Sequence, residues 1–240
     1  MKDVLVSAPY LLPELDRLMP VLKAFDLNVI VPEVHERLSE DEILAYAGKF
    51  DGTVFGDDRY TRRVIEACQP RLRVISKWGT GIDSIDQAAA ADFGVMVGNT
   101  PNAFTVPVSE SVLGYLLSFA RNIPWLDDAM KAGEWKKING KTLSESTLGV
   151  VGVGNVGQAV LRRARGFGME LLGNDIVDIA PDFLLENGVE MTSLQDLLSR
   201  SDFISINCDL NPTSQHLINA KTLSWVKPGA VLINTARGPI

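Results

Sequence analysis

The chain has 240 residues, is 46% hydrophobic and carries a net charge of −7. It is too apolar for a disordered protein, and the lack of acidic or basic blocks argues against nucleic acid or an anionic membrane as a partner. The length suits one large domain or two small ones. The two cysteines, Cys68 and Cys208, form neither a CxxC pair nor a disulfide framework, and no histidine cluster indicates a metal. We therefore expect a reduced, cytoplasmic setting.

The amino terminus passes directly into an apolar run, so we expect no signal peptide. The most apolar helical stretch, residues 111–120, is too short to span a bilayer and is bounded by Glu110 and Arg121. These features predict a soluble protein.

Short apolar runs alternate with helical patterns along the first 98 residues. The runs predict strands at 4–8, 28–31, 53–55, 73–76 and 95–97, and the patterns predict helices near 13–25, 40–48, 61–68 and 83–91. Ser39 and Glu42 form a capping box at the start of the second helix. Because this alternation is typical of parallel strands joined by crossover helices, residues 1–98 predict one α/β domain without a phosphate loop of its own.

The segment Asn99-Thr100-Pro101-Asn102 interrupts the alternation and predicts a hinge. A long amphipathic helix follows, which we expect to pack across the junction between domains. Its apolar face comprises Val108, Val112, Tyr115, Leu116 and Phe119. Trp125 and Trp135 flank a further helix that lies outside the strand alternation. Two interpretations of these tryptophans stay open: an arm that contacts a second subunit, and ordinary core packing.

The most informative motif is Gly152-Val153-Gly154-Asn155-Val156-Gly157. It follows an apolar run that predicts a buried strand, and it precedes apolar residues at helical spacing. A strand-to-helix turn with this glycine spacing is typical of a dinucleotide site. The first glycine allows a tight turn, the second lets the backbone approach a pyrophosphate, and the third lets helix and strand pack closely. The helix dipole then favours the anion.

A second apolar run ends at Asp175, where a carboxylate can accept hydrogen bonds from a ribose diol and repel a 2′-phosphate. No arginine or lysine follows directly, so NAD is favoured over NADP. Further strands are predicted at 148–153, 169–174, 189–191, 203–207 and 230–234. Residues 99–240 therefore predict an NAD-binding Rossmann domain. Because an open sheet of this type normally continues for another helix and strand, we expect its C-terminal part to be missing.

Four segments together resemble the D-isomer-specific 2-hydroxyacid dehydrogenases, in particular the branch related to D-3-phosphoglycerate dehydrogenase. They are Ser76–Asp86, the glycine motif with Asp175, Asn207–Ser214 and Lys227–Gly238. The resemblance implies two Rossmann-like or flavodoxin-like doubly wound α/β domains, the second incomplete. It also implies a homodimeric, NAD-dependent oxidoreductase that interconverts a small D-2-hydroxy acid and its 2-oxo acid by hydride transfer, with no nucleic-acid or membrane partner.

The resemblance also assigns roles to individual residues. Arg237 is the catalytic clamp for the substrate carboxylate or C2 oxygen, since a guanidinium offers a planar pair of charged donors. The substrate-binding residues are Trp78, Gly79, Thr80 and Gly81. The cofactor-binding residues are Thr105, Gly152, Gly154, Asn155, Val156, Gly157, Asp175, Cys208, Asp209, Ser214, Thr235, Ala236 and Arg237. For Lys77 and Trp78, pocket shaping and plain strand-end packing both stay open.

The chain departs from the family's pattern in three ways. Glu110-Ser111 stands where the family often has Glu-His. Asn207-Cys208-Asp209 stands where the family often has His-x-Pro, and the family's acid/base histidine with its acidic partner lies downstream of the arginine, after which only three residues follow here. Loss of acid/base catalysis costs about 10²–10⁴-fold in rate. Two alternatives therefore stand beside the dehydrogenase: a non-catalytic NAD-binding regulatory protein, and an inactive fragment. We expect His35 and His216 to be structural or surface residues.

Overall fold

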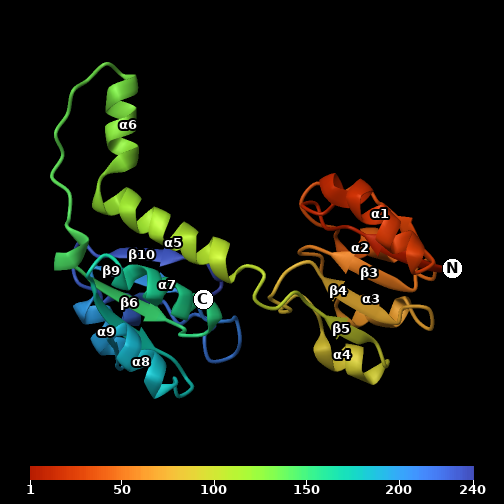
Figure 1. The fold of residues 1–240 in the computed structure, drawn as a ribbon. Helices are drawn as coiled ribbons and strands as arrows, with labels where there is room; N and C mark the ends of the chain where they lie inside the picture. Colours follow the sequence, from red (N-terminus) through yellow and green to blue (C-terminus); the bar gives the residue numbers. More distant parts are fainter. The chain divides into compact units, whose positions relative to one another are not determined.

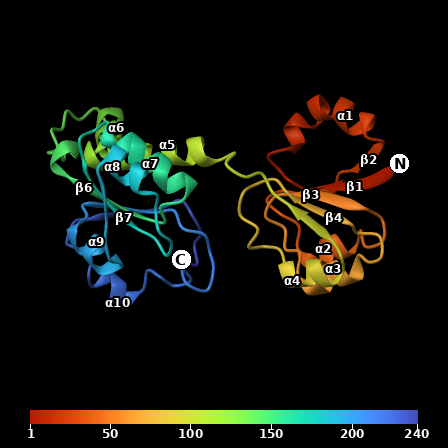
Figure 2. The ribbon, with the colours of Figure 1, turned by 60° about the horizontal axis from the view of Figure 1, so that its bottom comes forward.

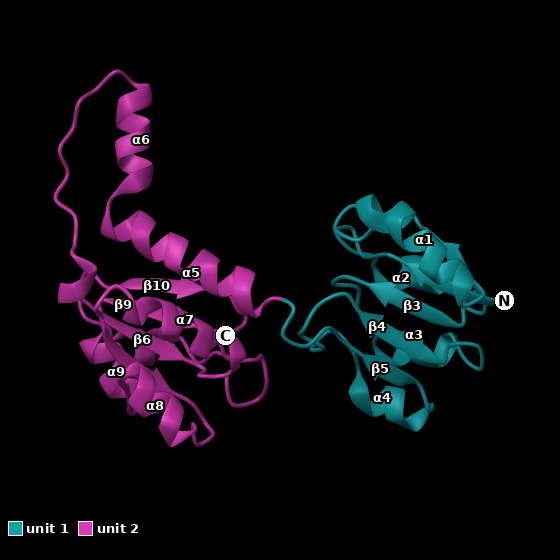
Figure 3. Ribbon diagram, in the orientation of Figure 1, with its two compact units in different colours: residues 1–103 teal, residues 104–240 magenta.

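The computed structural model describes residues 1–240 and divides into two compact units, residues 1–103 and 104–240 (Figure 3). Each unit contains one five-stranded sheet in which all strands are parallel. The predicted fold class of two doubly wound parallel-sheet domains is confirmed. The division between the units falls at the end of the predicted hinge rather than before it.

Unit 1 has the strand order β2-β1-β3-β4-β5. Its strands are β1 (Lys2–Val6), β2 (Leu27–Ile30), β3 (Gly52–Phe55), β4 (Val74–Lys77) and β5 (Met96–Gly98). Its helices are η1 (Leu12–Glu14), α1 (Leu15–Ala24), α2 (Glu40–Leu44), α3 (Arg62–Ala67) and α4 (Gln87–Asp92). Figure 2 shows α1 on one face of the sheet and α2, α3 and α4 on the other, so both faces of the sheet are covered.

Two helix starts in unit 1 follow from capping side chains. The predicted box at α2 is confirmed, because Ser39 N–H donates to Glu42 Oε2 at 2.7 Å and Glu42 N–H donates to Ser39 Oγ at 3.3 Å. The fourth helix begins later than predicted. The Asp86 carboxylate accepts the Ala89 N–H at 2.8 Å, which makes Asp86 the N-cap and leaves residues 83–85 outside the helix.

Unit 2 has the strand order β10-β9-β6-β7-β8. Its strands are β6 (Thr147–Val151), β7 (Glu170–Asn174), β8 (Val189–Met191), β9 (Phe203–Ile206) and β10 (Val231–Asn234). Its helices are α5 (Thr105–Ala120), α6 (Ile123–Lys131), η2 (Leu143–Glu145), α7 (Asn155–Arg165), α8 (Pro181–Asn187), α9 (Leu194–Arg200) and α10 (Ala220–Leu223). The central strand β6 is buried along its whole length, as expected for a parallel strand covered on both faces.

The predicted apolar face of α5 is partly wrong. The helix packs against α7 and β10, and its buried residues are Ser109, Val112, Leu113, Leu116 and Ala120. Tyr115 and Phe119 are 52% and 47% exposed. Phe119 instead meets Trp125 edge to face, with ring centroids 5.6 Å apart.

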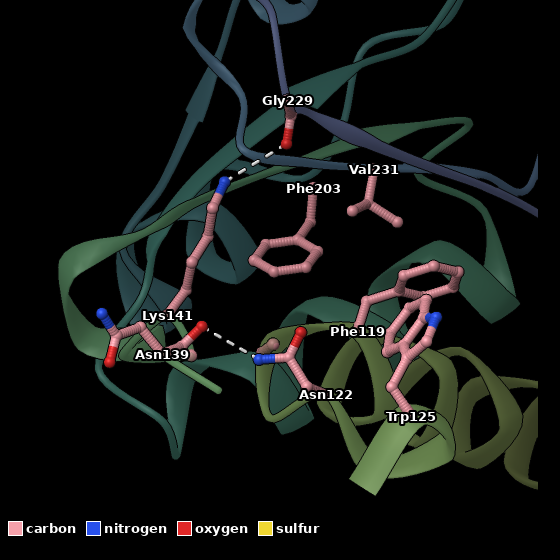
Figure 4. A pocket seen from close by; sticks show the side chains of 10 residues that line it. Phe119, Asn122, Trp125, Asn139, Lys141, Phe203, Gly229 and Val231 are labelled. Carbon is pink, nitrogen blue, oxygen red and sulfur yellow. Dashed lines mark hydrogen bonds between the residues drawn. The ribbon is translucent and has the colours of Figure 1, made fainter. Parts of the chain in front are cut away.

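Helix α6 extends away from the sheet of unit 2, and residues 132–142 return to it as an extended segment (Figure 1). Trp125 is 47% exposed and Trp135 is 80% exposed, so the core-packing interpretation of these tryptophans is wrong. At the base of α6 lies a cavity of about 210 Å³, lined in part by Phe119, Asn122, Trp125, Lys141 and Phe203 (Figure 4). No helix has both the length and the apolar character needed to cross a membrane.

Candidate functional site

The strand order of unit 2 reverses direction at β6, from which the chain continues first to β7 and later to β9. Ligands of open α/β sheets bind at the carboxyl ends of the strands at this reversal. Here the loops after β6 and β9 are in contact, since Asn207 N–H donates to Val151 O at 2.8 Å. A Cβ on Gly152 would lie only 2.6 Å from Cys208 Cα, and Gly152 has φ +87°. Both the contact and the backbone conformation therefore require glycine at this position.

The other two glycines of the motif differ in what surrounds them. A Cβ on Gly157 would collide with the carbonyl oxygen of Gly152 and lie 3.1 Å from Val150 Cγ1. Gly154 is the N-cap of α7, and a Cβ there would meet nothing within 4 Å. Gly157 is thus required by packing of α7 on β6, whereas Gly154 leaves open space before the positive end of the helix dipole. That open space suits a bound anion.

Asp175 lies directly after β7 and is half-buried. Its Oδ2 accepts the Val153 N–H at 2.6 Å, and its Oδ1 accepts the Val177 N–H at 3.1 Å. This carboxylate therefore ties the glycine turn to the loop after β7. Since a carboxylate has about four lone-pair sites, Asp175 can still accept hydrogen bonds from a diol.

The loop after β9 carries Cys208, Asp209 and Ser214. The Ser214 hydroxyl is buried, donates to Asp209 O at 2.5 Å and accepts the Asn211 N–H at 3.0 Å, so it holds the loop in shape. Cys208 packs beside the apolar cluster of β9, and burial raises the pKa of its thiol. Cys208 thus packs as a small apolar side chain, whereas Asp209 is exposed.

The loop after β10 is braced by the side chain of Asn234. Its Oδ1 accepts the Ala236 N–H at 2.9 Å, and its Nδ2 donates to Arg237 O at 2.9 Å. Arg237 is half-buried and its Nη1 donates to Ala236 O at 3.1 Å. The hydroxyl of Thr235 is buried and has no hydrogen-bond partner in the protein, which is uncommon and is expected where a ligand completes the site.

Thr105 is the first residue of α5, is half-buried, and belongs to the same unit as these loops. Through the packing of α5 on β10, Thr105 is part of the framework that carries the loop after β10. The predicted cofactor residues thus lie in one unit, where hydrogen bonds join the segments that follow β6, β7 and β9 and brace the loop after β10.

The predicted substrate turn, residues 78–81, lies in unit 1 directly after β4. Trp78 N–H donates to Phe55 O at 2.8 Å, and Thr100 N–H donates to Gly79 O at 2.9 Å. The side chain of Asn99 donates to Thr80 O at 2.7 Å. The turn is therefore held between the ends of β3 and β5, and Trp78 is 39% exposed beside it.

Sequence reasoning missed a polar cluster at the switch point of unit 1, which lies between β1 and β3. The buried Ser7 hydroxyl donates to the Asp58 carboxylate, and Leu38 N–H donates to the same carboxylate at 2.8 Å. Burial raises the pKa of Asp58. Ser7 follows β1 and Asp58 follows β3, and a polar residue just after a buried strand is the same signal that identified Asp175. His35 and His216 are exposed, in agreement with the expectation for both.

Comparison with known proteins decides the family. Residues 113–240 match the family described as "D-isomer specific 2-hydroxyacid dehydrogenase, NAD binding domain". The chain belongs to this family. The predicted cofactor, NAD, is confirmed by this match, and the residues fit it: Gly154 leaves a cradle open before α7, and Thr235 keeps an unpartnered hydroxyl.

Several members are similar over most of the chain. A D-3-phosphoglycerate dehydrogenase of Methanocaldococcus jannaschii is 37% identical over 211 residues, which cover 86% of this chain and 40% of that protein. A hydroxypyruvate reductase of Thermotoga maritima is 36% identical over 206 residues, 85% of this chain and 66% of that protein. A solved D-lactate dehydrogenase of Aquifex aeolicus, complexed with NAD and lactic acid, aligns with a TM-score of 0.84 and 27% identity over 99% of this chain and 69% of its own.

Proposed function

We propose that this chain is part of an NAD-dependent oxidoreductase that interconverts a small D-2-hydroxy acid and its 2-oxo acid by hydride transfer. The chain spans about 40% of the phosphoglycerate dehydrogenase and 66% of the hydroxypyruvate reductase described above. The observation that carries the proposal is the glycine turn of unit 2, joined to Asp175 through the Val153 N–H at 2.6 Å. NAD bound there supplies the hydride acceptor or donor for C2 of the acid.

The roles we propose follow the position of each residue. In unit 2 the glycine turn, residues 152–157, binds the pyrophosphate at the start of α7, and Asp175 accepts the ribose hydroxyls. Cys208 and Asp209 line the adenosine side, with Ser214 holding their loop. Thr105, Thr235 and Ala236 border the nicotinamide. Each of these assignments requires only contacts within unit 2, the unit that we assign to cofactor binding.

Roles in substrate binding are proposed separately for the turn after β4 in unit 1 and for Arg237 in unit 2. The guanidinium of Arg237 binds the carboxylate or C2 oxygen with two parallel donors, and orients C2. In unit 1, the backbone amides of Gly79, Thr80 and Gly81 are proposed to donate hydrogen bonds to the acid. In this proposal unit 1 is the substrate domain, so its strand-end loops set which acid is accepted.

The coenzyme test is a calorimetric titration of the chain with NADH and with NADPH. We expect NADH to bind at least about tenfold more tightly, because Asp175 repels a 2′-phosphate, a difference of roughly 1.4 kcal/mol. Asp175→Ala is expected to bring the affinities for NADH and NADPH closer together. Asp178 is an exposed acid in the same loop, so Asp178→Ala is the matched control. Tighter binding of NADPH, or no heat from either coenzyme with folded protein, would contradict the proposal.

We also propose that the protein is a homodimer built through α6 and the segment that follows it. This surface exposes Trp125, Met130, Trp135 and Ile138, which are between 41% and 80% exposed. Apolar groups gathered on a projecting helix are typical of an interface. We expect sedimentation equilibrium to give twice the chain mass, and Trp135→Glu to shift the protein toward the monomer. A monomeric wild type at micromolar concentration would contradict this proposal.

A cytoplasmic location is proposed on the state of the cysteines. Cys68 and Cys208 are both free thiols, and Cys68 is fully buried. Burial raises the pKa of the Cys68 thiol to about 11, so it stays protonated and unreactive. A reducing compartment suits a fold that relies on packing rather than on disulfide bonds.

A further inference from the structure

A buried lysine and a buried aspartate of unit 1 have no part in the proposed hydride transfer. They are Lys77, whose side chain is 5% exposed at the end of β4, and Asp58, which is fully buried after β3. Asp58 is bonded within the fold by Ser7 and Leu38 and serves as a strand-end scaffold. Lys77 is different, because its ammonium is directed onto the loop after β3 and reaches an exposed residue there.

That exposed residue is Asp57. Its carboxylate Oδ1 lies 2.7 Å from Lys77 Nζ, and its side chain is 70% exposed. Lys77 Nζ also donates to the carbonyl oxygen of Gly56, so two bonds fix the ammonium against this loop. The ordering of Asp57 does not depend on a ligand, since its partner is a buried cation of the same unit.

The pair lies directly beside the proposed substrate turn. The stem of Lys77 passes beneath Gly79, where a Cβ would lie 2.9 Å from Lys77 Cε. Trp78 N–H donates to Phe55 O at 2.8 Å, which joins the strand ends on which Asp57 and Lys77 lie. The Asp57 carboxylate is therefore bonded to the side chain that passes beneath Gly79, in the turn whose backbone amides we assign to the acid.

The charges around the turn are unfavourable for a second anion on the substrate. Lys77 is 5% exposed and its ammonium is bonded to Asp57 at 2.7 Å and to the Gly56 carbonyl oxygen, so the member of the pair that a ligand meets is the carboxylate. The next cation in the loop is Arg59, which is exposed. The residue after it is turned toward the loop that precedes α4, since Tyr60 N–H donates to Ser84 O at 3.0 Å. Asp57 is thus an exposed, ordered charge bonded to the side chain that passes beneath the turn.

From this arrangement we infer that Asp57, held by Lys77, is a specificity-determining residue that selects small 2-oxo acids without a second anionic group and rejects phosphorylated ones. The inference rests on the proposed function, because it concerns the acid bound at Gly79–Gly81. A phosphate ester brings about −1.5 to −2 charges to the carboxylate of Asp57. A neutral hydroxyl at the same position can instead donate a hydrogen bond to that carboxylate.

The test compares two acids that differ only by a phosphate: hydroxypyruvate and 3-phosphohydroxypyruvate. The chain is saturated with NAD⁺, so that no hydride can be delivered, and the amide shifts of Gly79, Thr80 and Gly81 are followed by NMR. We expect hydroxypyruvate to bind at least about tenfold more tightly at low salt. The ratio should shrink as ionic strength rises, because charge repulsion at an exposed site is screened. Neither measurement requires a variant.

Variants then assign the discrimination to one side chain. Asp57→Asn removes the charge and nearly keeps the shape of the side chain. We expect it to bring the ratio of the affinities for hydroxypyruvate and 3-phosphohydroxypyruvate at least about threefold closer to one. Asp41→Asn, an exposed acid on α2, is the matched control and should leave the ratio unchanged. Arg59→Gln tests the rival cation and should also leave it unchanged. The thermal midpoint of each variant confirms that it is folded.

Each outcome has a definite meaning. Preference of the wild type for the phosphorylated acid, an unchanged ratio in Asp57→Asn, or loss of phosphorylated-acid binding in Arg59→Gln would overturn the inference while leaving the proposed function in place. Failure of both acids to shift the Gly79–Gly81 amides, in protein that binds NAD⁺, would overturn both. The expected ratio, its salt dependence and its narrowing in Asp57→Asn together support the inference.

Discussion

Gly157→Ala is expected to destabilise unit 2 by about 3 kcal/mol, the upper end of the usual cost of overpacking, because the added methyl group has no room. The added Cβ would collide with the carbonyl oxygen of Gly152 and lie 3.1 Å from Val150 Cγ1. Neither group can move freely, since one belongs to the backbone of the turn and the other to the buried strand β6. Thermal unfolding followed by circular dichroism should show a midpoint lowered by roughly 10 °C.

Gly154→Ala is the matched control for that substitution. Its Cβ would meet no protein atom within 4 Å, and the backbone φ of −75° is accessible to alanine. Unfolding should therefore change by no more than about 1 kcal/mol, the usual range for an N-cap substitution. NADH affinity should still fall at least about tenfold, since the methyl group occupies the space proposed for the pyrophosphate. Equal stability of the two variants would contradict the packing role of Gly157.

Local sequence patterns were sufficient to predict the strands and the glycine turn, because both depend on residues that are close together in the chain. The strands of both sheets lie within two residues of the predicted ranges, because buried parallel strands are continuous apolar runs bounded by turns. The glycine turn was recognisable for the same reason. Strand, turn, helix and Asp175 follow one another along the chain, and the contact of Asp175 with the Val153 N–H joins segments of one βαβ unit.

Features that depend on distant segments could not be predicted in this way. Helix α5 carries apolar residues on more than one face, so the spacing of these residues does not show which face is buried. The packing of α5 on α7 and β10 decides this, and it leaves Tyr115 and Phe119 exposed. The cluster of Ser7, Leu38 and Asp58 joins three segments whose proximity follows only from the order of the strands. The pairing of Lys77 with Asp57 could not be predicted from the sequence either, because it depends on β3 and β4 being neighbours in the sheet.

Under the proposed function, Arg237→Lys is expected to lower kcat/KM for the 2-oxo acid by at least about 100-fold, although the charge is kept. A lysine ammonium cannot make the two parallel bonds that a guanidinium makes to a carboxylate, and the loss of one charge-stabilising donor at a reacting centre costs about 10²–10³-fold. Arg165→Lys, an exposed arginine at the end of α7, is the matched control and should keep full activity.

The geometry of the loop after β10 explains why the effect of Arg237→Lys should fall on the acid. Asn234 bonds both the Ala236 N–H and the Arg237 carbonyl, and the chain beyond is tied by His216 N–H to Pro239 O at 2.9 Å. The backbone at position 237 should thus stay in place in the variant, and the KM for NADH should change much less than the kinetic constants for the acid. A variant with normal kcat/KM for the acid, or one impaired only in its KM for NADH, would rule out the clamp.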